Sequence, residues 1–195
     1  MYIEDLSQIR GGYDHIYLSP HLDDAALSCG GAILAHLGAG ARVLVVTFST
    51  AAPPPEGPFS ALAEQFHADW KLSPEQAVAA RLQEEQLSME RLGCDYHWAG
   101  LLDAIYRFPD AYNQRESLFN TPAVGDPLAA SLPAVIGDLR ERFPKATFYA
   151  PLGVGSHVDH LITHASTYET LGEAAVFYED LPYAIVPGAL ERRLA

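Results

Sequence analysis

Two short stretches of the sequence combine imidazole and carboxylate side chains at a spacing that could form a reaction centre. Residues 19–24 read Ser-Pro-His-Leu-Asp-Asp, and residues 155–160 read Gly-Ser-His-Val-Asp-His. Each stretch follows an apolar run typical of a buried strand and precedes a helical pattern. In an open α/β sheet, ligands bind where the strands end at their carboxyl edge. Both stretches are therefore placed where a site would be.

The first stretch also has a simpler interpretation as a helix cap. Asp23 or Asp24 could accept a hydrogen bond from a free backbone N–H at the start of the helix, with His21 an ordinary loop histidine. Two strand ends with the same His/Asp chemistry are hard to explain as two caps. We therefore favour a shared site.

The ligand types in the two stretches are those of a catalytic zinc ion, which takes three protein ligands and keeps a position for water. His21 and Asp24 lie three residues apart across a strand-to-helix turn, and His160 completes a triplet. Asp23 is then beside the metal without binding it, which suits a general base acting on the water. Fe²⁺ accepts the same ligands, so it stays open beside Zn²⁺.

The rest of the second stretch is expected to face the same pocket. His157 precedes His160 by three residues, and an imidazolium there would donate a hydrogen bond to a developing oxyanion. Asp159 is expected to orient His157 and to raise its pKa.

Strand and helix patterns alternate along the whole chain. Strands are expected near residues 16–18, 42–48, 96–99, 147–150 and 175–178, and helices near 25–37, 74–92, 127–143 and 159–171. This order predicts one α/β domain over residues 1–195, Rossmann-like, with a mostly parallel sheet and helices on both faces. Gly30 and Gly31 come too late in the first helix to cradle a phosphate, which excludes dinucleotide binding.

Two stretches lack such patterns, at residues 51–60 and 104–126. Both contain several Pro, Gly or Asn residues and are expected to be loops. One interpretation is that they form a lid over the carboxyl edge of the sheet; the alternatives are disorder for the first and a surface excursion without function for the second. By periodicity alone, Arg81, Glu84 and Glu85 read as solvated charges on a helix.

The composition excludes several classes of partner. Residues are 49% hydrophobic and 19% charged, as in a globular protein, and the formal net charge of −13 argues against nucleic acid or an anionic membrane. A membrane span and a secretory signal are not expected, which favours a cytoplasmic location. Cys29 and Cys94 read as reduced core thiols.

The two stretches resemble the motifs of a known family. Residues 21–24 and 157–160 are similar to the His-Pro-Asp-Asp and His-Pro-Asp-His motifs of the LmbE-like (PIG-L) N-acetylglucosaminyl deacetylases, with Leu22 and Val158 in place of the prolines. The resemblance implies a role for each His and Asp of the two motifs. Zinc would be bound by His21, Asp24 and His160, the general base would be Asp23, and the tetrahedral intermediate would be stabilised by His157 with Asp159 as its partner.

The resemblance extends to two residues outside the motifs. Residues 81–84 read Arg-Leu-Gln-Glu on a helix that ends in Leu92-Gly93, similar to the family's Arg-x-x-Glu helix. It implies that Arg81 contacts the sugar, as does Asp103, which resembles a loop Asp of the family. A Tyr that some members carry before the second motif is absent. The chain is short for the family, which implies that a C-terminal portion is missing.

The implied activity is a metal-dependent hydrolase that removes acetyl from an N-acetylglucosamine-like or related N-acetylated sugar conjugate. One alternative is a catalytically silent sugar-binding protein on the same fold, and the intact His/Asp set argues against it. A deacylase of a non-sugar amide is another. A two-His-one-carboxylate iron oxygenase has the same ligand types, but the α/β pattern and the Asp beside the metal disfavour it. Homo-oligomerisation is left open.

Overall fold

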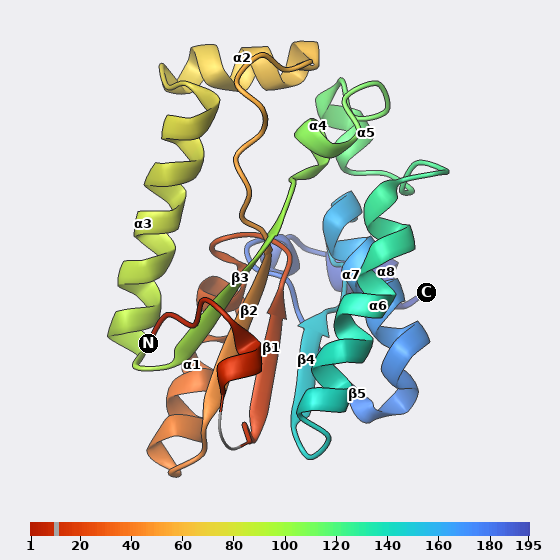
Figure 1. Cartoon of the computed structure of the whole chain (residues 1–195). Helices are drawn as coiled ribbons and strands as arrows, with labels where there is room; N and C mark the ends of the chain where they lie inside the picture. The colour runs from red at the N-terminus through yellow and green to blue at the C-terminus, as the bar shows by residue number, and fades with distance from the viewer. Residues whose placement is uncertain (10–11) are drawn as a thin grey trace.

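The computed structural model describes residues 1–9 and 12–195 and contains one five-stranded sheet (Figure 1). The strands are β1 (His15–Ser19), β2 (Val43–Ser49), β3 (Asp95–Leu101), β4 (Thr147–Pro151) and β5 (Ala175–Tyr178). Their order is β3-β2-β1-β4-β5, and all neighbours pair in parallel. The predicted α/β fold with a parallel sheet is confirmed. The strand order reverses direction at β1, so the crevice between β1 and β4 is the topological switch point of the sheet.

Helices cover both faces of the sheet. The helices are α1 (Asp24–Gly38), α2 (Ala61–Trp70), α3 (Pro74–Leu92), α4 (Ala104–Arg107), α5 (Arg115–Leu118), α6 (Pro127–Arg142), α7 (Val158–Leu171) and α8 (Ala189–Leu194), with 3-10 turns η1 (Leu6–Gln8), η2 (Gly172–Ala174) and η3 (Tyr183–Ile185). Figure 1 shows α1 and α3 on one side of the sheet and α6 and α7 on the other.

The pleat of the strands divides the core between these two faces. Ile16 and Leu18 of β1 pack in the cluster that contains α6 and α7 residues, whereas Tyr17 packs with α1 and α3 residues. All seven residues of β2 are buried, as expected for a strand covered on both faces. Cys29 and Cys94 are buried and unpaired, as predicted.

The boundaries of α3 follow from local sequence chemistry. Ser73 and Gln76 form a capping box, Pro74 occupies the first turn, and Gly93 ends the helix with a φ of 77°. These bounds match the prediction. Helix α2 was not predicted, because its buried residues are few and it packs on a local cluster rather than on the sheet.

That local cluster lies above the carboxyl ends of the strands, where Figure 1 places α2, α4 and α5. Its buried members are Leu62, Ala63, Ala104, Ile105, Tyr112, Leu118 and Val158. We call residues 59–66 and 104–118 the cap. Helices α4 and α5 therefore lie within the stretch predicted to be irregular. Each is a single turn, which is too short for a helical repeat of apolar residues to show in the sequence.

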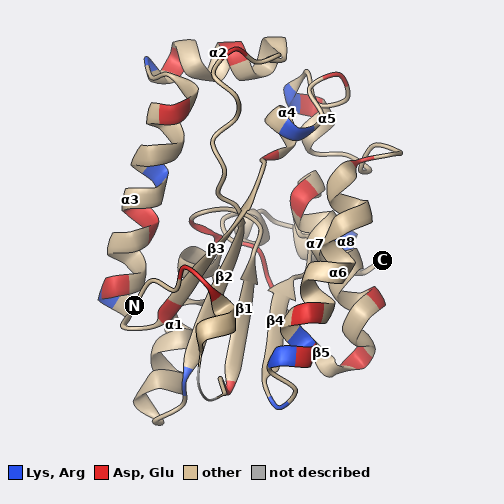
Figure 2. Cartoon of the chain, in the orientation of Figure 1, with Lys and Arg blue, Asp and Glu red and all other residues tan. Residues whose placement is uncertain are grey.

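Acidic residues outnumber basic ones by 25 to 12, and Figure 2 shows them spread over most of the helices. Among the described residues, none of the helices is both long and apolar enough to cross a membrane.

Glu85 is an exception to the solvated helix face that periodicity predicts. It is buried on α3, where the Thr47 hydroxyl donates a hydrogen bond to its Oε1 over 2.7 Å. Burial raises the pKa of Glu85 from 4.5 to about 7, against the effect of this hydrogen bond. The folded protein therefore keeps a proton that the unfolded chain releases.

This proton makes stability depend on pH. Its contribution is fully present below about pH 4.5 and is lost as the pH rises through about 7. We expect the unfolding free energy of the wild type to fall relative to that of Glu85→Gln between about pH 5 and pH 8, by on the order of 3 kcal/mol. Denaturant unfolding of both proteins at the two pH values measures the difference. The same pH dependence in both would contradict a protonated Glu85.

Candidate metal centre

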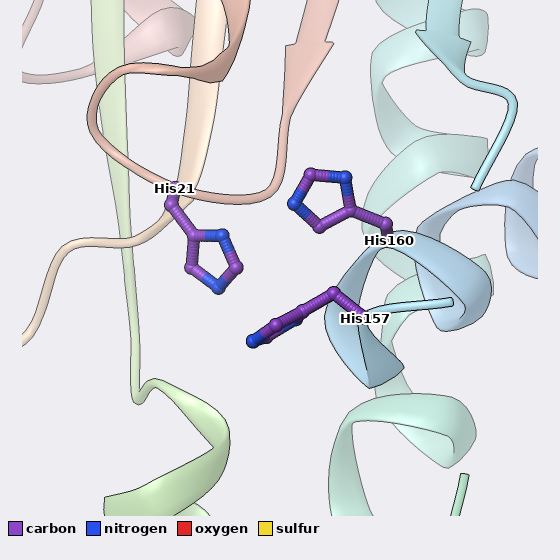
Figure 3. Close-up of side chains that lie close together, drawn as sticks. All are labelled: His21, His157 and His160. Atoms are coloured by element: carbon purple, nitrogen blue, oxygen red, sulfur yellow. The ribbon is translucent and has the colours of Figure 1, made fainter. Parts of the chain in front are cut away.

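The two His/Asp stretches meet at the switch point of the sheet, because β1 and β4 are neighbours. His21 comes from the turn after β1, and His157 and His160 come from the start of α7. Figure 3 shows the three imidazoles facing one another across the crevice. One nitrogen from each ring lies within 4.8 Å of the others. Residues 136 or more positions apart in the chain thus share one small volume.

A network of short-range hydrogen bonds shapes the first turn. The Ser19 hydroxyl donates to the His21 carbonyl oxygen over 2.7 Å and accepts from the Ala25 N–H at 3.1 Å. The His21 N–H donates to Asp24 Oδ2 over 2.9 Å. The turn therefore presents Asp24 inward at the first residue of α1.

Two imidazole nitrogens lie close to one carboxylate oxygen. Asp24 Oδ2 lies 3.3 Å from His21 Nδ1 and 3.3 Å from His160 Nε2. In a tetrahedral site with zinc–ligand bonds of about 2.0–2.1 Å, neighbouring donors are separated by about 3.3 Å. Each of the two Asp24 contacts therefore has the spacing of neighbouring ligands of a small divalent ion.

The outer nitrogens of the two imidazoles are held by other carboxylates. His21 Nε2 lies 3.0 Å from Asp159 Oδ2, and His160 Nδ1 lies 2.6 Å from Asp180 Oδ1. An ionised carboxylate only accepts hydrogen bonds, so these outer nitrogens carry the protons. The inner nitrogens, His21 Nδ1 and His160 Nε2, are then available as metal ligands.

The electrostatics of the site favour a positive charge at its centre. Burial lowers the pKa of an imidazole, yet hydrogen bonds to Asp159 and Asp24 raise the pKa of His21 well above its ordinary value. The charge of Asp24 and the hydrogen bond to Asp180 likewise raise the pKa of His160 to about 9, against the effect of burial. Three buried carboxylates thus surround two imidazoles. Such surroundings stabilise a bound cation, so the charge of the site fits a divalent metal.

His157 has the opposite electrostatic character. Burial and the positive charge of His21 lower the pKa of His157 to about 4, although Asp159 opposes the shift. The Asp159 N–H donates to His157 Nδ1 over 3.3 Å, so His157 Nε2 carries the proton of the neutral ring. The expected imidazolium is therefore wrong for this structure. The Asp159 carboxylate contacts His21 rather than His157.

The remaining predicted residues line a cleft of about 210 Å³ beside the three imidazoles. The Asp23 side chain is 55% exposed there, whereas that of Asp24 is 8% exposed. Arg81 Nη2 lies 3.3 Å from Asp23 Oδ1. Asp103 caps α4 by accepting from the Ile105 N–H, and its Oδ2 is 3.7 Å from His21 Nε2. All eight predicted site residues are thus within or next to this cleft.

Sequence reasoning missed three residues that contact the site. Asp180 follows β5 and holds His160, and the rule that sites gather at strand ends could have found it. Arg107 of α4 contacts Asp159, with no signal in the sequence. Tyr183 lines the cleft and packs against Gly155, where its ring leaves no room for a Cβ.

The lid differs from the one expected. Residues 104–126 reach the site through Phe119, whose ring is edge-on to His157 at 5.2 Å. Residues 51–60 do not line the cleft, and the segment Leu181, Pro182 and Tyr183 after β5 does so instead. The carboxyl end of β5 lies closer to the site than the order of the chain suggested.

A family model described as "PIG-L: GlcNAc-PI de-N-acetylase" matches residues 16–171. The chain belongs to the PIG-L family. The match includes both His/Asp stretches, Arg81 and Asp103, and it confirms the resemblance drawn from the motifs.

Three related proteins are informative. The 2'-N-acetylparomamine deacetylase of Streptomyces fradiae is 31% identical over 174 residues, which are 87% of this chain and 57% of that protein. A deacetylase solved in complex with teicoplanin, from the teicoplanin biosynthesis pathway, has a TM-score of 0.75 and 29% identity, covering 90% of this chain and 73% of that one. The zinc-inhibited form of teicoplanin deacetylase has a TM-score of 0.72 and 29% identity, with coverage of 89% and 70%. This chain thus spans little more than half the length of the first relative.

Proposed function

We propose that this PIG-L protein is a metal-dependent N-deacetylase that hydrolyses the acetamide of an N-acetylated amino sugar or sugar conjugate. The observation that carries the proposal is that Asp24 Oδ2 lies 3.3 Å from both His21 Nδ1 and His160 Nε2, beside a cleft. The names of the relatives support an N-acetylated sugar as the substrate class.

His21, Asp24 and His160 would hold the divalent ion, either Zn²⁺ or Fe²⁺. When bound there, such an ion lowers the pKa of a water molecule and polarises the amide carbonyl. The buried carboxylates of Asp159 and Asp180 keep the two imidazoles in the orientation that exposes their inner nitrogens.

Asp23 is the proposed general base. Its exposed carboxylate lies at the cleft, next to Asp24 but outside the proposed ligand set. It would take a proton from the attacking water and then return a proton to the leaving nitrogen, so that the products are acetate and a free amine.

His157 is proposed to stabilise the developing negative charge on the carbonyl oxygen. Its Nε2–H is free to donate because Nδ1 already accepts the Asp159 N–H. A neutral ring is sufficient for this role, since an oxyanion is stabilised by any well-placed donor in a water-poor site. Arg81 and Asp103 would contact the sugar hydroxyls from the sides of the cleft.

The test is acetate release from a panel of N-acetylated amino sugars and simple non-sugar acetamides. Protein stripped of metal is compared with protein reloaded with Zn²⁺ or with Fe²⁺. We expect release from sugars only, and only after reloading. Release mainly from the non-sugar amides would favour the broader deacylase, and sugar binding without release in either metal form would favour the silent sugar-binding protein.

Arg81→Ala tests the substrate contact. We expect it to lower kcat/KM by about 10-fold or more, mostly through KM, because a substrate contact is lost. Metal content and thermal stability should change little, since the ion pair of Arg81 with Asp23 is exposed and worth under about 1 kcal/mol. Steady-state kinetics on the best substrate of the panel measure the effect. An unchanged kcat/KM would show that Arg81 is an ordinary surface charge.

A further inference from the structure

We propose that Arg107 is a positioning residue that holds metal ligand His21 in place through Asp159 and thereby connects the cap to the metal centre. The inference rests on the proposed metal site. It adds a residue that lies outside both motifs and does not reach the cleft.

Arg107 is the last residue of the single-turn helix α4, and its side chain is only 7% exposed. Every nitrogen of its guanidinium has a partner. Nε and Nη2 donate to the two oxygens of Asp126 over 2.7 and 2.9 Å. Nη2 also donates to Asp159 Oδ1 over 2.6 Å, and Nη1 donates to the Leu102 carbonyl over 2.8 Å. One buried cation thus lies between two buried carboxylates.

Asp159 uses its two oxygens for different partners. Oδ1 accepts from Arg107, while Oδ2 lies 3.0 Å from His21 Nε2 and accepts weakly from the Ala104 N–H at 3.3 Å. A buried carboxylate that loses a charged donor would turn toward another donor. Arg107 therefore fixes the Asp159 carboxylate with Oδ2 toward His21 Nε2.

This orientation determines which nitrogen of His21 faces the metal. A carboxylate that only accepts keeps the proton on Nε2 and leaves Nδ1 for the ion. If the carboxylate turned away, His21 Nε2 would lose this acceptor, and the ring would no longer be held with Nδ1 toward the ion. Residues that orient a ligand in this way are typically worth about 10–100-fold in metal affinity.

The same guanidinium also anchors the cap. Asp126 is the N-cap of α6 and accepts from the Tyr112 hydroxyl over 2.7 Å and from the Leu128 N–H over 2.8 Å. If Arg107 had only a structural role, it would act through these contacts with Asp126 and not through Asp159. Tyr112→Phe is a matched control. It removes the hydrogen bond to Asp126 and the one that the hydroxyl accepts from the Ala123 N–H, and it leaves the contact of Arg107 with Asp159 untouched.

The experiment measures Zn²⁺ affinity by competition with a chelator and records the visible spectrum of the Co²⁺-loaded full chain, both without substrate. We expect Arg107→Met to weaken Zn²⁺ binding by about 10–100-fold and to change the Co²⁺ spectrum, with kcat falling more than KM rises. Arg107→Lys should give a smaller loss, since an ammonium cannot form the same fork. Tyr112→Phe should lower thermal stability while leaving affinity and spectrum unchanged.

Two results would overturn the proposal. One is wild-type Zn²⁺ affinity and spectrum in Arg107→Met, and the other is an equal loss of affinity in Tyr112→Phe. If Arg107→Met does not fold, Arg107→Lys is compared in the wild type and in Asp159→Asn. Arg107→Lys should have no further effect on affinity in Asp159→Asn, and an additive effect would contradict the link through Asp159. Because no readout except the kinetic one involves acetate release, a failure of the proposed deacetylation would leave this test intact.

Discussion

Replacing Asp23 by Asn is expected to lower kcat by about 10²–10⁴-fold, the usual scale of general acid–base catalysis, while the metal content stays near that of the wild type. Asn has nearly the shape of Asp but cannot accept a proton at neutral pH. The exposure of the two neighbouring aspartates supports this separation of roles. The Asp23 side chain is 55% exposed at the cleft, whereas that of Asp24 is 8% exposed and contacts two imidazoles.

The measurement pairs steady-state acetate release with metal analysis of the same Asp23→Asn preparation. Arg81→Ala serves as the control, because it removes the ion-pair partner of Asp23 and leaves the carboxylate in place. If Asp23→Asn loses metal in proportion to activity, the roles of Asp23 and Asp24 are exchanged. If kcat is unchanged, another group accepts the proton.

Replacing Asp24 by Asn is expected to weaken metal binding by more than about 100-fold, and acetate release should fall with the occupancy of the site. The loss of an outer partner of a metal ligand already costs about 10–100-fold, so loss of a ligand should cost more. Asp24 Oδ2 is also the atom shared by His21 Nδ1 and His160 Nε2, and without its charge the two imidazoles have no common anionic partner.

Asp103→Asn is the matched control for this substitution. Asp103 is also a carboxylate near His21, and with Asp159 it forms a second group of close donor atoms. We expect its replacement to lower kcat/KM and to leave Zn²⁺ affinity within a few-fold of the wild type. A loss of affinity in Asp103→Asn as large as that in Asp24→Asn would place the ion on the outer side of His21, among Asp103 and Asp159.

The amino-acid sequence by itself determined the five strands, the four longest helices and the residue types of the candidate site. Periodicity and caps depend on neighbours a few residues away, which is why the limits of α3, from the Ser73 capping box to Gly93, could be predicted. The two His/Asp stretches are equally local. Each comes directly after a strand, and parallel strands present their carboxyl ends at one edge, so a shared site followed from two short patterns.

Only the tertiary structure decided which partners each site residue has. The order of the strands placed β1 beside β4, which brought His21 to Asp159 across 138 positions of sequence. The partner of His160 turned out to be Asp180 after β5, and that of Asp159 was Arg107 in a helix of one turn. These contacts determine which nitrogen of each imidazole carries the proton. Packing also lowers the pKa of His157 instead of raising it. The physical reason is that pKa values and tautomers depend on burial and on charges a few ångströms away, which are set by packing between distant segments and not by the residues adjacent in the chain.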